Sequence, residues 1–362
     1  MRTFDFAKIY DTLLTPEIVS LMGQIHEYKG KQVLFVQAKP NALRVLAEIA
    51  RIQSSEASNR MDGICTSEER LKKLVQDKTM PRTRSEREIA GYRDVLTAIH
   101  ENYEYLPPKT AILLQLHRDL YKFSGAFYGG HYKTGDNVMM QTDASGHKTV
   151  RFQPVPARET PEAMEQLCRA FEEAVQQGQM DPLLLIPVFV LFFLCIRPFD
   201  EGNFRMSRLL TLLLLCRQGY FVGRYVSIEK RIEQSKGAYC DALQYSFCRW
   251  QEGETDCRPF VRYMLGVVAA AYREFSDRVR VLTAADMGKP DRIREILKKH
   301  RGKITKAELM TQCPDISLAT VQRTLAELQK KGEILKLGGG RYTAYTWNHD
   351  KEYTYAGQRT EK

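Results

Sequence analysis

The sequence lacks paired cysteines, a hydrophobic run of membrane-spanning length and a secretion signal. Its eight cysteines are scattered, and none stands in Cys-x-x-Cys spacing, which excludes the common zinc and thiol-redox motifs. The longest nearly unbroken apolar run covers residues 183–196, whereas a transmembrane helix needs about 20 apolar residues. The first residues show no basic flank followed by an apolar stretch. We therefore expect a cytoplasmic protein with reduced thiols and no membrane partner.

The composition that is present is typical of a globular protein. The 362 residues are 43% hydrophobic and 27% charged, which excludes a disordered or collagen-like chain. Their number allows two or three domains. The formal net charge is +10, and residues 290–362 contain 15 Lys and Arg against 9 Asp and Glu. A basic region of this kind indicates either nucleic-acid binding or a solvated surface.

Hydrophobic periodicity predicts a mainly α-helical protein. Residues 183–196 are apolar on all sides, which is typical of a buried central helix. A short charged loop joins them to a second apolar helix predicted over residues 204–216. The polar stretch Gln53–Asn59 is expected to interrupt the helix that begins near Ala42. Residues 137–153 predict a β-hairpin, because β-type residues flank a turn sequence. Further helices are predicted over residues 85–101, 113–121, 161–177, 227–250 and 259–281.

The last part of the chain has the element order of a winged helix-turn-helix domain. A helix, a short helix and a longer helix precede two strands that flank Gly338–Gly340. Short polar side chains open the third helix and suit a DNA major groove, but winged helices also bind proteins, and both partners stay open here. These side chains belong to Ser317, Thr320, Gln322 and Arg323. The elements are expected at residues 291–300, 305–313, 317–331, 333–337 and 341–347.

The charged loop and the helix after it carry the residue types of a polyphosphate site. Gly202 and Asn203 stand at a helix N-terminus, where free N–H groups and the helix dipole favour an anion. Arg205 and Arg208 are three residues apart and therefore share a helix face. Glu201 is placed to hold a divalent cation that bridges phosphates. The alternative is an ordinary helix start with an acidic cap and two surface arginines.

The stretch Arg197–Arg208 resembles the signature H-P-F-x-(D/E)-G-N-(G/K)-R-x-x-R of the Fic (Fido) family. The resemblance implies a Fic-type helical core that binds ATP and Mg²⁺ and transfers AMP to a hydroxyl side chain of a target protein. It implies that Glu201 holds the metal and that five motif residues bind the nucleotide and its phosphates, namely Gly202, Asn203, Phe204, Arg205 and Arg208. The residues that match in register are Pro198, Phe199, Glu201, Gly202, Asn203, Arg205 and Arg208.

The segment Ser58–Gly63 looks like the inhibitory motif of this family, (S/T)-x-x-x-E-(G/N). In that motif the acid pairs with the second arginine of the signature and blocks productive placement of the γ-phosphate. The resemblance implies that Ser58 and Asp62 act on Arg208 in this way. The alternative is a helix-capping serine with a nearby acid.

Other segments resemble further parts of a Fic protein. The hairpin at residues 137–153 looks like the flap that registers the target segment, which implies a docking role for Val150 and Phe152. Ser85–Tyr92 resembles the N-terminal helix of the family, and Gly130–Thr134 resembles its G-x-(Y/F)-(R/K)-T turn. Tyr239 and Leu243 resemble positions that line the nucleotide pocket of the family. The alternative is that they pack in the core.

Arg197 stands where the family has its catalytic histidine. A general base needs an available lone pair and a pKa near the working pH, and a guanidinium group has neither. His131 and His147 are considered as substitutes. Phe204 replaces the usual Gly or Lys and disfavours positive φ. We therefore expect an impaired adenylyltransferase that still binds nucleotide.

Two other functions remain open. The first is a nucleotide-sensing regulator without catalysis whose winged helix binds DNA or protein, and the second is a Fic-like transferase with a different donor, as in Doc-type relatives. Assembly into a homodimer is also open. The expected organisation is an N-terminal helical region at 1–110, a Fic core at 111–283, a linker at 284–290, a winged helix at 291–350 and a tail at 351–362.

Overall fold

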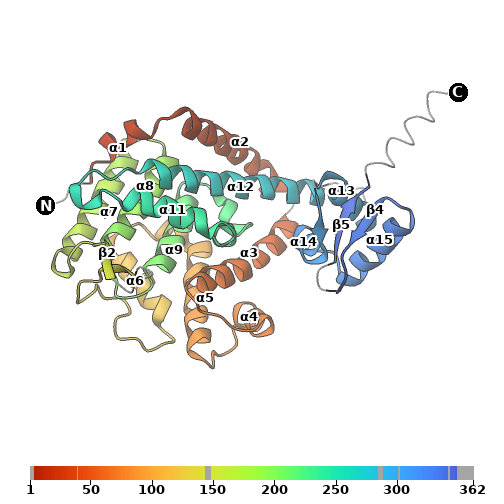
Figure 1. Cartoon of the computed structure of the whole chain (residues 1–362), viewed down its shortest axis with the longest axis horizontal. Coiled ribbons are helices and arrows are strands. Elements are labelled where there is room, and N and C mark those ends of the chain that lie inside the picture. The colour runs from red at the N-terminus through yellow and green to blue at the C-terminus, as the bar shows by residue number, and fades with distance from the viewer. Residues whose placement is uncertain are drawn as a thin grey trace. The chain divides into compact units, whose positions relative to one another are not determined.

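The computed structural model describes residues 4–38, 40–142, 148–283, 288–300, 302–340 and 343–348. The chain forms two compact units. Residues 1–33 and 47–273 make up the first unit, and residues 34–46 and 274–362 make up the second. In the part of the chain that is described, no helix is both long enough and apolar enough to cross a membrane. The protein is mainly helical (Figure 1), as predicted.

Two buried helices form the centre of the first unit. Helix α8, Pro182–Ile196, is buried along its whole length after Pro182, and helix α9, Asn203–Arg217, packs against it. Asp181 caps α8 through a hydrogen bond to the N–H of Leu183, and Pro182 follows at the first helical position, where proline is tolerated. The prediction of two central apolar helices joined by a charged loop is confirmed.

The helices around this centre position the loop between α8 and α9. Helix α9 contacts α5, α5 contacts α6, and α7 covers α8. The bounds are α1 Phe6–Leu13, α2 Pro16–Ala38, α3 Pro40–Met61, α4 Glu68–Val75, α5 Arg84–Asn102, α6 Thr110–Tyr121, α7 Thr160–Gln177, α10 Ile228–Gln234, α11 Lys236–Phe247 and α12 Arg258–Thr283. The single helix predicted over residues 227–250 is therefore divided into α10 and α11.

The prediction that the polar stretch Gln53–Asn59 interrupts a helix is wrong. Helix α3 continues through it to Met61. The reason is that two of its buried polar side chains find partners: Ser54 donates to Glu229, and Asn59 donates to the carbonyl of Ser55. Polar groups that are satisfied in this way do not break a helix.

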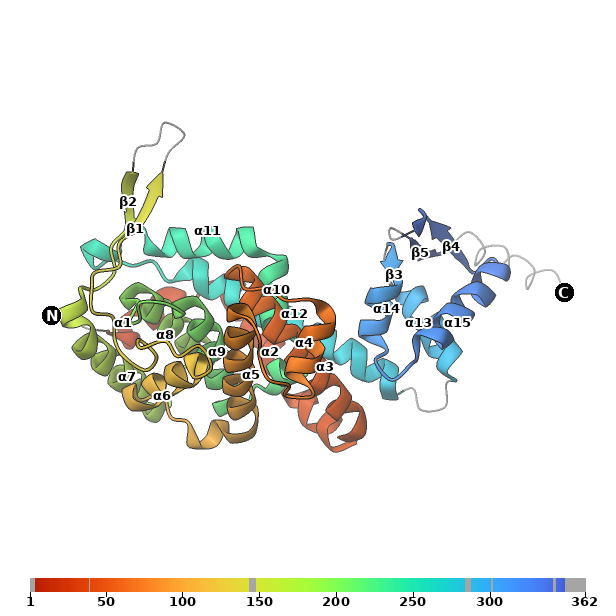
Figure 2. The same cartoon turned by 90° about the horizontal axis from the view of Figure 1, so that it is seen from below.

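An antiparallel hairpin is present where two strands were predicted. Strand β1, Met139–Thr142, pairs with strand β2, Lys148–Phe152, in a register that places Met140 opposite Val150. Figure 2 shows the two strands extending beyond the helices of the first unit. The turn around Asp143–Gly146 lies outside the described residues.

In the second unit, the described residues from 288 to 348 form three helices and a small sheet in the order that the sequence predicts. The sheet has the strand order β3-β5-β4, and both pairs are antiparallel. Ile293, Val321 and Trp347 belong to its core. The predicted linker ends inside the first helix, because Pro290 occupies the first turn of that helix. The bounds are α13 Lys289–Lys299, β3 Ile304–Thr305, α14 Lys306–Gln312, α15 Leu318–Lys330, β4 Ile334–Leu337 and β5 Ala344–Trp347.

Candidate functional site

The loop between α8 and α9 is a tight turn closed by one side chain. Asn203 accepts a hydrogen bond from the N–H of Phe199 at 3.0 Å and donates one to the carbonyl of Phe199 at 2.7 Å. Gly202 has φ +78°, and a Cβ there would lie 2.8 Å from the hydroxyl of Tyr121. The side chain of Asn203 is thus committed to the loop, which leaves backbone N–H groups as the anion donors at the start of α9.

His117 on α6 holds the loop from one side. Its Nδ1 accepts a hydrogen bond from the N–H of Gly130 at 3.0 Å, so the ring proton is on Nε2, which donates to the carbonyl of Glu201 at 3.1 Å. The ring also stacks on Phe199 at 3.7 Å. The ring is fully buried, and burial lowers the pKa of His117 to about 4. Because both nitrogens are engaged, His117 has no free lone pair for base catalysis.

Lys133 and Asn137 hold the loop from the other side. Lys133 Nζ donates to the carbonyl of Ile196 and to Asn137 Oδ1, both at 3.0 Å, and Asn137 donates to the carbonyl of Phe199 at 3.0 Å. Burial lowers the pKa of Lys133 to about 8. His131 is exposed on the turn before it, and His147 lies outside the described residues.

The pKa of His117 leads to a prediction on stability. Its folded pKa of about 4 lies below the ordinary value of about 6.5, so the unfolded chain binds this proton more readily. The stability that neutral His117 supplies is complete above about pH 6.5 and is lost as the pH falls through about 4, at a cost of about 3 kcal/mol. Urea unfolding between pH 7 and 4 is expected to show this slope reduced in His117→Gln. An identical slope in the variant would contradict the assignment.

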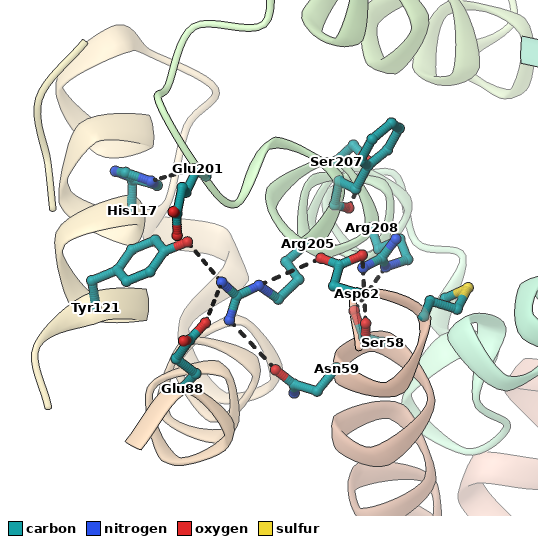
Figure 3. A network of polar contacts seen from close by, with 12 residues as sticks. Ser58, Asn59, Asp62, Glu88, His117, Tyr121, Glu201, Arg205, Ser207 and Arg208 are labelled. Atoms are coloured by element: carbon teal, nitrogen blue, oxygen red, sulfur yellow. Dashed lines mark hydrogen bonds and ion pairs between the residues drawn. The ribbon is translucent and has the colours of Figure 1, made fainter. Parts of the chain in front are cut away.

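Arg208 and Asp62 are in contact, as the sequence comparison implied. Arg208 Nη2 lies 3.2 Å from Asp62 Oδ1 and donates to the carbonyl of Ser58 at 2.9 Å, and Arg208 Nε donates to Ser58 Oγ at 2.7 Å (Figure 3). Ser58 lies on α3, and Asp62 directly follows the end of this helix. The pair therefore links the end of α3 to the second arginine of the signature.

Arg205 is engaged by acidic and polar side chains (Figure 3). It is 2% exposed, and its Nη2 lies 2.8 Å from Glu88 Oε2 and 2.7 Å from the hydroxyl of Tyr121. Its Nε lies 3.6 Å from Asp62 Oδ2. The sequence analysis did not assign Glu88 or Tyr121 to the site. The sequence does contain a pattern that could have identified them. Glu88 and Tyr92 are four residues apart, as are His117 and Tyr121, so each pair places polar groups on one face of a helix that is buried.

Glu201 is the residue that could hold a divalent cation. Its side chain is 51% exposed, and its Oε2 accepts a hydrogen bond from the hydroxyl of Tyr128 at 3.0 Å and lies 4.0 Å from Arg84 Nη2. Burial raises the pKa of Tyr128 to about 12, which keeps this hydroxyl a donor. Among the described residues, no group of three or more His, Cys, Asp and Glu side chains could hold a metal. A Mg²⁺ ion here fits a site with one carboxylate, water and substrate phosphates.

Arg197 lies close to Phe204, whose side chain lines a largely apolar cavity. It caps α8 with φ +48°, its guanidinium carbon lies 5.7 Å from the centre of the Phe204 ring, and burial lowers its pKa. Its Nε is buried without a hydrogen-bond partner in the described part of the chain. The cavity has a volume of about 340 Å³ and is lined by Asp62, Arg208, Phe204, Tyr239, Leu243 and others.

The two residues predicted to dock a target differ in their surroundings. Val150 is 59% exposed on β2. Phe152 is buried and stacks on Phe247 of α11 with 4.4 Å between ring centres, and both rings line the same cavity. The base of the hairpin is thus part of the cavity wall.

Known proteins resemble this chain in part of its sequence and in its fold. Residues 107–215 match the model of the Fic/DOC family. The fold is similar to a Fic family protein from Desulfovibrio desulfuricans G20, with 21% identity, 93% of this chain and 97% of that chain covered, and a TM-score of 0.59. It is also similar to a Fic domain containing signaling protein from Bacteroides thetaiotaomicron VPI-5482 (19%, 73% and 98%, 0.58) and to Fic-1 (aa134–508) from C. elegans (16%, 74% and 74%, 0.58). No curated protein matches.

Proposed function

We propose that this chain, which carries a Fic/DOC family domain at residues 107–215, is a nucleotide-binding protein adenylyltransferase with impaired turnover. Fic proteins generally transfer a nucleotide monophosphate to proteins. The observation that carries the proposal is the guanidinium of Arg197, which stands at the position of the base beside a loop that departs from the signature otherwise only at Phe204. The nucleotide would be Mg–ATP and the acceptor a hydroxyl side chain of another protein.

The residues of the loop have separate tasks in this proposal. Glu201 would hold Mg²⁺, which when bound screens the charge of the phosphates. The backbone N–H groups of Gly202 and Asn203 would bind phosphate oxygens at the start of α9. Arg208 would meet the γ-phosphate once Asp62 releases it, and Arg205 adds positive charge behind it. The aromatic and aliphatic wall that includes Phe204, Tyr239 and Leu243 would enclose the nucleotide.

Transfer of AMP requires a base that this site does not provide efficiently. A bond forms between the target oxygen and the α-phosphorus, the bond to the β-phosphate oxygen breaks, and pyrophosphate leaves. The proton of the attacking hydroxyl must go to a base, and protonated Arg197 cannot accept it. Both ring nitrogens of His117 are already hydrogen-bonded, one to the carbonyl of Glu201 and the other to the N–H of Gly130. The proposal is therefore that the site binds Mg–ATP but transfers AMP inefficiently.

Asp62 is expected to restrain nucleotide binding, because it holds the cation that would meet the γ-phosphate. Asp62→Asn should raise the affinity for Mg–ATP about tenfold, the effect of releasing one charge-assisted hydrogen bond. Isothermal titration calorimetry measures the change. Glu56→Gln is the control, since Glu56 lies on the same helix and pairs only with the surface residue Arg60 in the contacts described. Equal affinities in Asp62→Asn and the unmodified chain would remove the inhibitory role.

A second function is favoured by the same Arg197 and by the basic C-terminal region. It is a nucleotide-sensing regulator whose residues 291–350 form a winged helix that binds DNA or a protein. Incubation of the full chain with labelled ATP and a lysate separates the two. Label transfer that disappears in Glu201→Ala supports the adenylyltransferase. Thermal stabilisation by Mg–ATP without transfer, together with salt-sensitive binding of a DNA duplex, supports the regulator.

A further inference from the structure

The end of α3, which is followed directly by Asp62, is tied to helix α10 by an ion pair. Arg60 Nη2 donates to Glu233 Oε2 at 2.7 Å, and Arg60 Nε donates to Oε1 of the same carboxylate. This two-point geometry adds direction as well as energy to the contact. Arg60 Nη1 also pairs with Glu56 at 2.8 Å, but Glu56 belongs to α3 itself. The pair with Glu233 therefore fixes α3 to another element, and the pair with Glu56 does not.

A lysine and the turn after α3 connect this ion pair to Asp62. Lys236, the first residue of α11, donates to the carbonyl of Met61 at 3.4 Å. Met61 is the last residue of α3, where carbonyl groups lack partners within the helix and a cation is favourable. The N–H of Gly63 donates to the carbonyl of Arg60 at 3.0 Å and closes a turn around Asp62. The position of Asp62 therefore follows that of Arg60.

The contacts that Asp62 makes with the two arginines of the signature are longer. Its Oδ1 lies 3.2 Å from Arg208 Nη2 and its Oδ2 lies 3.6 Å from Arg205 Nε, whereas a strong charge-assisted bond is about 2.7–2.9 Å. Ser58 is held more closely, with 2.7 Å from its Oγ to Arg208 Nε, but it lies one turn earlier in the helix. Asp62 follows the last helical residue, and helix ends fray most easily. Its place against Arg208 thus depends on what holds the end of α3.

We infer that Arg60 and Glu233 are positioning residues that hold Asp62 against Arg208 and thereby regulate nucleotide binding. The inference rests on the proposed function, since it names the regulation of the same nucleotide site. Asp62 and Arg208 line the same cavity, so the end of α3 forms part of the wall of the site. While the ion pair is formed, the carboxylate stays against the guanidinium. When the pair opens, the end of α3 can move away and Arg208 becomes available to a phosphate.

Charge reversal in the full chain tests the ion pair. Arg60→Glu and Glu233→Arg each place like charges opposite one another, and each should raise the affinity for Mg–ATP about threefold to fivefold, the contribution of one partly exposed ion pair. The two variants change the net charge in opposite directions, so a gain in both cannot come from the overall field of the protein. The double variant restores an ion pair in the reverse sense and should return the affinity to that of the unmodified chain. Isothermal titration calorimetry measures all three.

Dependence on Asp62 separates this role from a general loosening of the fold. In Asp62→Asn the contact with Arg208 is already weakened, so the addition of Arg60→Glu should give no further gain. The effects of the two substitutions should therefore not add, as expected for residues that act through one contact. A loosened fold would change the affinity alike in both backgrounds.

Arg258→Glu is the matched control for the charge reversal. Arg258 forms the same two-point pair with Asp256, at 2.9 and 2.8 Å, at the start of α12. Its side chain is 56% exposed, close to the 47% of Arg60, so the two pairs are comparable. The affinity of this variant for Mg–ATP should not change. Unchanged affinity in both Arg60→Glu and Glu233→Arg, or an equal gain in the Asp62→Asn background, would overturn the inference.

Amide hydrogen exchange gives a readout that needs no nucleotide. The N–H groups of Asp62 and Ile64 both donate to the carbonyl of Asn59, at 3.0 and 2.9 Å, and are protected while the end of α3 is held. Their exchange should be about threefold to fivefold faster in Arg60→Glu and unchanged in Arg258→Glu. If the unmodified chain does not bind Mg–ATP, the proposed function fails, and exchange alone decides whether the ion pair positions Asp62. Faster exchange supports that role, and unchanged exchange overturns it.

Discussion

Arg197→His is expected to raise AMP transfer from Mg–ATP by about 10²–10⁴-fold, the contribution of a positioned general base. The imidazole would have a lone pair and a pKa near neutrality, both of which the guanidinium lacks. The loop around it is already held by His117, Lys133 and Asn137, so the new side chain enters a fixed setting. Transfer of label from ATP to proteins of a lysate, or to the chain itself, measures the gain.

Arg197→Gln is the control for that experiment, because it removes the charge without supplying a base. It should leave transfer near the level of the unmodified chain. If Arg197→His gives no gain, Phe204→Gly is added, since Phe204 lies close to Arg197 and replaces the Gly or Lys that is usual in the signature. No gain even in the double variant would contradict the proposal that the missing base is the defect.

Glu88→Ala is expected to lower the free energy of unfolding by about 3–5 kcal/mol, which is typical when one partner of a buried ion pair is removed. Arg205 is 2% exposed and its Nη2 lies 2.8 Å from Glu88 Oε2. Among the described residues, the substitution leaves this buried cation with Asp62 as its remaining ion-pair partner, at 3.6 Å. Urea denaturation measures the change.

Glu69→Ala is the matched control for this loss of stability. Glu69 also pairs with a cation, Lys73, but its side chain is 79% exposed. Exposed pairs contribute about 0–1 kcal/mol, so the control should remain close to the unmodified chain. A loss below about 1 kcal/mol in Glu88→Ala would show that Arg205 is not held by a buried pair.

The central helices and their loop could be predicted from the sequence because their signal is local. The apolar composition of the two runs is enough to predict α8 and α9 as buried helices. The spacing of the residues from Glu201 to Arg208 is enough to detect the motif. The contact of Asp62 with Arg208 was implied by resemblance to a family, not by periodicity. These predictions needed no knowledge of which distant segments meet.

The errors and omissions concern contacts that are distant in sequence. The polar stretch at residues 53–59 was expected to break a helix because its partner, Glu229, is far away along the chain. His117 and Lys133 donate hydrogen bonds to carbonyl groups of the loop. Every residue has a backbone carbonyl, so the sequence does not indicate which carbonyl groups accept these bonds. A charged residue such as Glu88 is usually exposed at the protein surface. Glu88 is buried because it pairs with Arg205, which is distant in the sequence. Pairing across the fold, not local pattern, determines these positions.

A titration of the full-length chain with Mg–ATP, followed by intact-mass analysis after incubation with a lysate, tests most directly whether this site holds a nucleotide that it cannot efficiently use. The account predicts saturable binding that Glu201→Ala weakens, with AMP transferred to a partner only slowly and far below one equivalent. Rapid, stoichiometric AMP modification by the unmodified chain would contradict it, and so would the absence of any binding.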